Sequence, residues 1–303
     1  MDAIATESLV KRYGDRRGID GVSLRVPAGS LFGFIGPNGA GKTTTIRILL
    51  GLLFPTAGHA RLFGRDVVAD GPAARAGVGY VPGESHVYPD LRVGELLAFL
   101  GRFHAGDPRR RRAELAEALD LDLGARAIDL SLGNRKKVAI TAALQHRPRL
   151  VVLDEPTNGL DPVVRAGLFD LLRAEAAAGT TVFFSSHALA EVQAVCQQVA
   201  VLREGRLVAV DDVEALRGRE TRRVSASFER GGSAEVLAGL PGIDRLSRDG
   251  TAVTFLYDGA MPALLRALAA AAPSDVRIEE PSLEEIFLRH YAPRAPGGHH
   301  VDA

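Results

Sequence analysis

Residues 36–43 combine glycines, a lysine and a threonine in the order Gly-Pro-Asn-Gly-Ala-Gly-Lys-Thr, which fits the phosphate-loop pattern G-x-x-x-x-G-K-[ST]. Glycines let the backbone turn tightly, so that successive N–H groups converge on a phosphate group. We expect Lys42 to contact the β- and γ-phosphate oxygens and the hydroxyl of Thr43 to ligate Mg²⁺. The predicted site for a nucleoside triphosphate comprises Gly36, Pro37, Asn38, Gly39, Ala40, Gly41, Lys42, Thr43 and Thr44.

The residues on either side of this segment distinguish a phosphate loop from a glycine-rich turn that matches by chance. The apolar run 31–35 predicts a strand that leads into the segment. Apolar residues recur at helical spacing after it, at Ile46, Leu49, Leu50 and Leu53. This spacing predicts a helix whose N-terminus adds positive potential at the phosphates. Strand, loop and helix in this order favour the phosphate loop.

A second group of candidate residues follows the apolar run 150–153. Asp154 and Glu155 come directly after it, a pattern typical of a buried parallel strand that ends in carboxylates. Ligands in such folds bind at the carboxyl ends of strands, so we expect Asp154 beside the phosphate loop as a ligand of Mg²⁺. Glu155 is then placed to act as general base on an attacking water.

Three more segments carry polar residues in the same part of the chain. Segment 130–134 reads Leu-Ser-Leu-Gly-Asn, the turn-rich loop 156–162 carries another acid, and segment 183–187 reads Phe-Phe-Ser-Ser-His. With the phosphate loop and the acid pair, their order and spacing resemble the nucleotide-binding subunit of an ABC (ATP-binding cassette) transporter. The resemblance extends over about residues 3–217.

The resemblance implies a role for each of these segments. Glu155 would be the catalytic base, and His187 would contact the γ-phosphate. Asp161 would belong to the D-loop, and Tyr13 would stack on the adenine ring. ATP and Mg²⁺ are the implied cofactors.

Segment 130–134 corresponds to the family's signature, which caps the ATP bound to the opposite subunit. The resemblance therefore implies that a second copy, or a related ATPase subunit, joins this chain to enclose two ATP molecules. The family's signature usually reads Leu-Ser-Gly-Gly-Gln, whereas Asn134 offers a shorter side-chain amide. The predicted contacts come from Ser131, Leu132, Gly133 and Asn134.

A second departure follows segment 79–82, which reads Gly-Tyr-Val-Pro. The family places a glutamine next, where it senses Mg²⁺ and the membrane partner, but this chain has Gly83 and then Glu84. Either Glu84 takes over this role, or the loop acts as a hinge for which a glycine backbone is suited. The hinge is favoured, because Glu84 adds negative charge where phosphates crowd. Similar substitutions occur in the branch that pairs with separate permeases of ABC-2-type exporters.

The composition restricts the classes of partner. Lys and Arg number 37 and Asp and Glu number 37, so no net charge favours a polyanion and no nucleic acid is expected. The run 109–112 consists of four arginines followed by acids, which favours a solvated helix face over a lipid or nucleic-acid patch. The single cysteine, Cys196, excludes an internal disulfide and is interpreted as a packing residue.

No apolar run approaches the ~18 residues of a membrane span, and no signal peptide is visible. We expect the protein to be cytoplasmic, peripheral on the inner face of the cell membrane through an integral-membrane permease encoded separately.

The elements predicted around the site give an α/β fold, and the resemblance implies a P-loop NTPase core of the ABC ATPase type. Strands within residues 1–35 predict an antiparallel sheet beside the core. Residues 84–146 read mainly helical, and residues 147–217 return to alternating strand and helix, which completes a parallel sheet. Residues 1–217 would form this ATP-binding domain.

After residue 217 the pattern predicts a small α+β accessory domain, 218–292, and a loose tail, 293–303. Its order, β-α-β-β-α-β, is that of a split βαβ arrangement. The helices are expected over 234–240, 262–272 and 282–290. The role of this domain stays open between regulation or dimer support and simple packing.

These observations predict an ATP-hydrolysing subunit that dimerises on ATP and drives a separate permease, with export favoured by the resemblance. The alternative is a soluble ABC ATPase that acts on nucleic acid or ribosomes without a permease. Such proteins usually carry two cassettes or a long coiled coil, whereas this chain has one phosphate loop and no sustained heptads. A GTP switch protein would need an Asn-Lys-x-Asp segment, which the sequence lacks.

Overall fold

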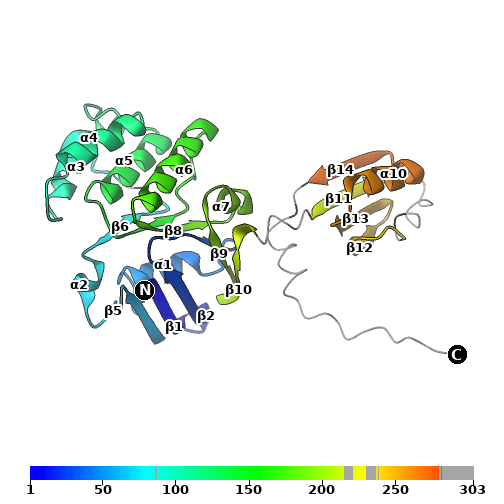
Figure 1. Cartoon of the computed structure of the whole chain (residues 1–303), viewed down its shortest axis with the longest axis horizontal. Coiled ribbons are helices and arrows are strands. Elements are labelled where there is room, and N and C mark those ends of the chain that lie inside the picture. Colours follow the sequence, from blue (N-terminus) through cyan, green and yellow to red (C-terminus); the bar gives the residue numbers. More distant parts are fainter. Residues whose placement is uncertain (86, 215–220, 230–236, 238, 280, 282–303) are drawn as a thin grey trace. The chain divides into compact units, whose positions relative to one another are not determined.

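The computed structural model describes residues 1–303 apart from 86, 215–220, 230–236, 238, 280 and 282–303. Its contacts divide the chain into two compact units, Met1–Val213 and Glu214–Ala303 (Figure 1). The first unit contains every residue predicted to bind nucleotide. The predicted helix 282–290, the tail 293–303 and most of the predicted helix 234–240 lie outside the described residues.

The centre of the first unit is a six-stranded sheet in the order β10-β9-β3-β8-β7-β6, parallel except for β10. Its strands are β3 (Leu31–Ile35), β6 (Val78–Val81), β7 (Leu150–Asp154), β8 (Thr181–Ser186), β9 (Gln198–Arg203) and β10 (Arg206–Asp212). All residues of β3, β7 and β8 are buried, as expected of parallel strands covered on both faces. The predicted parallel core is therefore confirmed.

Helices cover both faces of this sheet. Figure 1 shows α5 (Leu132–Leu144) and α6 (Pro162–Ala177) on one side and α1 (Lys42–Leu49) on the other. Ile46 and Leu49 of α1 belong to the same buried cluster as Phe32 and Phe183 of the sheet. A short helix, α7 (Leu189–Val195), also contacts β3 and β8, and it ends at the buried Cys196. Burial raises the pKa of the Cys196 thiol, which agrees with a packing role.

A four-stranded antiparallel sheet, β2-β1-β4-β5, packs against α1 through the same cluster. It consists of β1 (Asp2–Tyr13), β2 (Arg16–Pro27), β4 (Ala57–Leu62) and β5 (Arg65–Asp66). The expectation that residues 31–35 join this sheet is wrong, because β3 lies between β8 and β9 in the parallel sheet. The reason is burial: five consecutive buried residues need cover on both faces.

The predicted helical part contains α3 (Val93–Gly101), α4 (Arg109–Ala118) and α5, while the short α2 (Gly71–Arg75) lies below them in Figure 1. The arginine run opens α4, where Arg109 pairs with Asp107 and Arg110 with Glu114 at exposed positions. These pairs agree with a solvated face for Arg109 and Arg110, whereas Arg111 is only 18% exposed and pairs with the buried Glu175. Within the described ranges, none of the helices combines the length and hydropathy needed to span a bilayer.

The second unit contains an antiparallel sheet in the order β12-β13-β11-β14. Its described elements are β11 (Arg222–Ser227), β12 (Ile243–Asp249), β13 (Ala252–Tyr257), α10 (Met261–Ala271) and β14 (Asp275–Glu279). β13 lies between β11 and β12, which is the insertion that defines a split βαβ arrangement. Phe255 and Tyr257 of β13 pack against Leu264 and Leu268 of α10 in a separate core.

Candidate nucleotide site

The glycine-rich loop joins the carboxyl end of β3 to the first turn of α1. Its glycines are required either by backbone conformation or by close packing. Gly41 precedes α1 with φ 105°, and Gly39 has φ 80°, both in the left-handed region that favours glycine. A Cβ on Gly36 would lie 2.2 Å from the carbonyl oxygen of Leu202. Backbone shape and close packing on β9 therefore fix the loop.

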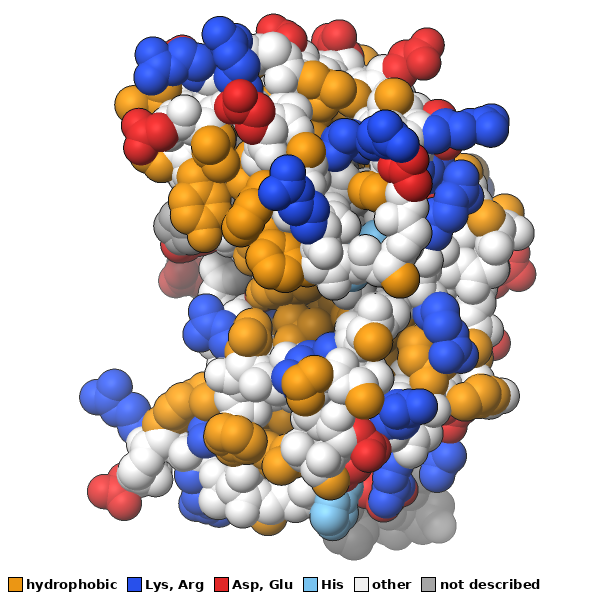
Figure 2. Space-filling model, turned by 90° about the vertical axis from the view of Figure 1, so that its left-hand side faces the viewer, with side chains coloured by type: hydrophobic (Ala, Val, Ile, Leu, Met, Phe, Trp, Pro, Cys, Tyr) orange, Lys and Arg blue, Asp and Glu red, His pale blue; other side chains and the backbone are white. Residues whose placement is uncertain are grey.

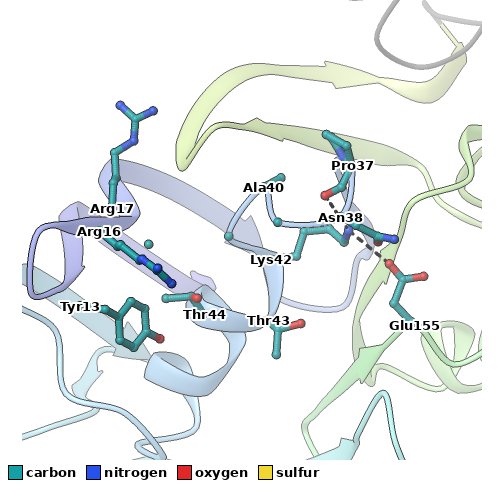
Figure 3. A pocket seen from close by; sticks show the side chains of 13 residues that line it. Tyr13, Arg16, Arg17, Pro37, Asn38, Ala40, Lys42, Thr43, Thr44 and Glu155 are labelled. Atoms are coloured by element: carbon teal, nitrogen blue, oxygen red, sulfur yellow. Dashed lines mark hydrogen bonds and ion pairs between the residues drawn. The ribbon is translucent and has the colours of Figure 1, made fainter.

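A pocket of about 470 Å³ opens beside this loop (Figure 3). It is lined by residues 37–44, by Tyr13, Arg16, Arg17 and Gly18 of the β1–β2 hairpin, and by Glu155. Tyr13 is 47% exposed, so its ring is available to a ligand. The two arginines are additions to the predicted site. The turn after Tyr13 could have indicated them, because a hairpin brings the residues that follow Tyr13 back beside its ring.

Lys42 is the buried cation of the pocket, with 5% of its surface exposed. Its Nζ donates hydrogen bonds to the carbonyl oxygens of Gly36 at 2.6 Å and Pro37 at 3.4 Å. The same nitrogen lies 3.2 Å from Glu155 Oε1, as the dashed lines in Figure 3 show. The lysine therefore curls over its own loop and pairs with the predicted base.

Glu155 comes directly after β7 with φ 48°, an uncommon backbone conformation for a residue with a side chain. Its backbone N–H donates to the carbonyl oxygen and to the hydroxyl of Ser185, each at 3.2 Å. Its Oε2 lies 2.8 Å from Nδ1 of His187, which is half exposed just beyond β8. The structure thus brings Lys42, Glu155 and His187 into one connected group, although the sequence separates them widely.

Asp154 lies behind this group as the last residue of β7, and it does not line the pocket surface. It is 2% exposed and accepts a hydrogen bond from the hydroxyl of Ser185 at 2.8 Å. The hydroxyl of Thr43 and the carboxylate of Asp154 are both hard oxygen donors, the type that Mg²⁺ prefers. In the part of the chain that the structure describes, no group of three or more His, Cys, Asp and Glu suits a metal. A hydroxyl and one carboxylate fit Mg²⁺, because this ion commonly takes its remaining ligands from phosphate and water.

The residues predicted to form the signature and the D-loop lie close together, outside this pocket. Ser131 caps α5, where its Oγ accepts the N–H of Asn134 at 3.2 Å. Asp161 caps α6 by accepting the N–H groups of Val163 and Val164 at 3.0 Å, and these bonds lower its pKa. None of Ser131, Leu132, Gly133, Asn134 and Asp161 contributes to the pocket lining.

Gly133 and Gly159 are packed closely, because a Cβ on Gly133 would lie 3.2 Å from the carbonyl oxygen of Gly159. The predicted signature is therefore packed against the loop that carries the predicted D-loop residue Asp161. Leu132 is mostly exposed. Gly83 and Glu84 come shortly after β6, the strand that pairs with β7. They do not line the pocket either.

Comparisons with known proteins agree on one family. The ABC transporter family model matches residues 19–158. The daunorubicin resistance ATP-binding protein DrrA3 of Streptomyces coeruleorubidus is 35% identical over 302 residues, which cover 94% of this chain and 95% of that protein. The Nod factor export ATP-binding protein I of Paraburkholderia xenovorans (strain LB400) is 37% identical over 219 residues, covering 71% and 72%.

A solved structure of an ATP-binding subunit of an ABC transporter aligns with a TM-score of 0.67 at 29% identity, covering 71% of this chain and 92% of that one. The first relative spans nearly the whole chain, so the similarity includes the second unit. The chain therefore belongs to the ABC transporter family, in which it is an ATP-hydrolysing subunit.

Proposed function

We propose that two such subunits close over two ATP molecules and that hydrolysis powers an exporter permease encoded separately. The observation that carries this proposal is the contact of Glu155 with both Lys42 and His187 beside the phosphate loop. A base, a phosphate-binding cation and a γ-phosphate contact are the parts that hydrolysis of ATP requires. Export is inferred from the relatives, one named for drug resistance and one for Nod factor export.

Each side chain has a distinct task in this mechanism. Lys42 stabilises negative charge on the β- and γ-phosphate oxygens, and Glu155 accepts a proton from the attacking water. His187 orients the Glu155 carboxylate and contacts the γ-phosphate. Thr43 and Asp154 hold Mg²⁺, which when bound neutralises charge on the phosphate oxygens. Tyr13 stacks on the adenine ring, whose π-face is recognised without reading its polar edge.

The position of the signature supports a dimer. Ser131–Asn134 lie outside the pocket that contains the phosphate loop, next to the D-loop. A second subunit that places these residues over the phosphate loop would complete each ATP site. The exposed side chain of Leu132 then becomes an interface residue. Each site is incomplete in a single subunit under this proposal.

We assign one face of the first unit to a membrane partner. Figure 2 shows hydrophobic side chains around a hollow between the part that contains α3 and the part that contains α2. Exposed aromatic residues in and around α3 include Tyr88, Phe99 and Phe103, and the ring centroids of Phe99 and Phe103 are 5.2 Å apart. An exposed apolar patch of this kind marks an interaction surface. We assign it to the permease, which would hold the subunit at the inner face of the membrane.

Isolation of the tagged chain from detergent-solubilised membranes, followed by identification of its companions, tests the proposal. The expected companion is an integral-membrane protein whose presence stimulates ATP hydrolysis. A Phe99→Ser/Phe103→Ser double variant should lose this companion while it still binds ATP. Recovery with ribosomes or nucleic acid alone would instead support the soluble ABC ATPase.

A further inference from the structure

Lys136 is a buried cation that the mechanism above does not use. It lies in α5, is 1% exposed, and its Nζ donates hydrogen bonds to the carbonyl oxygens of Pro82 at 2.9 Å and Gly83 at 2.7 Å. Burying an ammonium group is costly unless polar partners compensate for the lost water. A fully buried lysine that binds two successive carbonyl groups is therefore a specific arrangement, and not a solvated helix face.

The two carbonyl groups belong to the loop beside the predicted metal ligand. Pro82 and Gly83 follow β6, which pairs in parallel with β7, the strand that ends at Asp154. A Cβ on Gly83 would lie 3.6 Å from the backbone oxygen of Asp154 and 3.9 Å from its Oδ2. Lys136 thus binds this loop through its carbonyl groups, and the loop in turn lies against Asp154.

The charges around Lys136 support the same arrangement. Burial lowers the pKa of Lys136, while the carboxylates of Asp154 and Glu155 act in the opposite direction. The ammonium group therefore lies within the electrostatic field of both acids. At its other end, Lys136 is anchored in the helix that begins after the signature residue Ser131. One side chain thus joins the signature helix to the loop at the base of the site.

We propose that Lys136 is a positioning residue that holds the 82–83 loop against Asp154 and links this loop to the signature helix. The proposal rests on the roles proposed above for Asp154 and Glu155. Gly83 has no side chain with which to reach the site, so in this chain the loop is connected through its backbone carbonyl groups. Loss of the link should disturb the geometry needed for hydrolysis more than the binding of ATP.

The next residue provides a matched control. Lys137 is 7% exposed and lies on the same helix, but its Nζ donates to the carbonyl oxygen of Asp120 at 3.3 Å. Lys136→Met and Lys137→Met therefore remove the same charge from buried positions of the same helix. They differ in whether the lost hydrogen bonds lead to the 82–83 loop.

The first measurement is hydrogen exchange of the backbone amides of residues 83–85 in the nucleotide-free, full-length protein. Lys136→Met should speed this exchange about tenfold, because the loop opens locally once its carbonyl groups lose their donor. Lys137→Met should leave it unchanged. Lys136→Gln provides the same test if the methionine variant does not fold, because a glutamine is too short to reach both carbonyl groups. Equal exchange rates in the Lys136 and Lys137 variants overturn the proposal.

The second measurement separates binding from turnover. Lys136→Met should lower kcat about tenfold or more while KM for ATP changes less than about threefold, and Lys136→Arg should restore most of the loss. A purely structural role would lower thermal stability and raise KM in both lysine variants alike. If the wild-type protein neither binds nor hydrolyses Mg-ATP, the proposed function fails, whereas the exchange experiment still decides whether Lys136 holds the loop.

Discussion

Nζ of Lys42 and Oε1 of Glu155 lie 3.2 Å apart, so the lysine of the phosphate loop and the predicted base form an ion pair. Both side chains are largely buried, at 6% and 13% exposed. A phosphate group that binds Lys42 must therefore compete with the carboxylate for the same ammonium group. Under the proposed mechanism the pair would link nucleotide binding to the orientation of the base, because Glu155 would have to turn from Lys42 toward the attacking water.

The Glu155→Gln variant tests this relationship. The amide cannot act as a base, so hydrolysis should slow about 10²–10⁴-fold. It also removes a negative charge that competes for Lys42, so ATP should bind about three- to tenfold more tightly, on the order of 1 kcal/mol. Equilibrium binding and light scattering with Mg-ATP would show tighter binding and an accumulated dimer.

Glu155→Asp is the control, because it keeps the charge and shortens the side chain. It should not gain ATP affinity to the same extent. Hydrolysis at the wild-type rate by Glu155→Gln, or no dimer with or without the permease, would contradict the assignment of Glu155.

Tyr13 provides a prediction about the base pocket. It is 47% exposed at the end of β1, so its removal costs little core packing. Tyr13→Ala should weaken ATP binding by about 1–3 kcal/mol, the range measured for stacking of bases on aromatic rings. Tyr13→Phe keeps the ring and should bind ATP nearly as the wild type does. Calorimetric titration measures this binding, and a comparison of ATP with GTP checks that the ring accepts either purine. Undiminished binding by the alanine variant would show that the adenine ring is held elsewhere.

The sequence predicted those parts of the site that depend on residues close together in the chain. The phosphate loop and the Asp154–Glu155 pair depend on adjacent residues, so a local pattern was enough to find them. The cap that Asp161 forms on α6 was not predicted, although Asp-Pro at the start of a helical pattern is a local helix-start signal. The resemblance to a family contributed Tyr13 and His187.

The remaining contacts depend on sheet order and could not be predicted in this way. Ser185 reaches both acids only because β8 lies beside β7, and Lys136 reaches Gly83 across 53 positions of sequence. The misplaced strand 31–35 has the same origin. Its apolar run predicted a strand, but its neighbours, β8 and β9, follow much later in the chain.

The loop after β6 offers a prediction about coupling. A Cβ on Gly83 would meet its nearest neighbour at 3.6 Å, an ordinary contact, so the glycine is not required by lack of space. The hinge interpretation, in which Glu84 is outside the reacting group, stays a prediction, and neither Gly83 nor Glu84 lines the nucleotide pocket. Glu84→Ala should then hydrolyse ATP within about threefold of the wild type, a barrier change under ~0.7 kcal/mol. Steady-state hydrolysis by the isolated subunit measures this, and a loss near 10²-fold would place Glu84 in the reaction.

Gly83→Pro is the complementary change. Proline fixes φ and removes the backbone N–H, so the loop can no longer act as a hinge. ATP binding should survive, whereas stimulation of hydrolysis by the permease should be lost. Gly83→Ala, which fits the available space, is the control and should retain stimulation. Full stimulation of the proline variant would contradict the hinge.

The stacked rings of His104 and His146, with centroids 3.6 Å apart, predict how stability depends on pH. Burial, with the His104 charge as a second cause, lowers the pKa of His146 to about 4, and burial also lowers that of His104. In the unfolded chain His146 binds a proton at its ordinary pKa of about 6.5, whereas in the folded chain it does not bind one until the pH approaches 4. The free energy of unfolding should therefore fall as the pH drops from about 6.5 to about 4. His146→Phe keeps an aromatic ring without the proton site, so its denaturation midpoint should change less over this interval. Parallel pH profiles of variant and wild type would show that other groups set the acid stability.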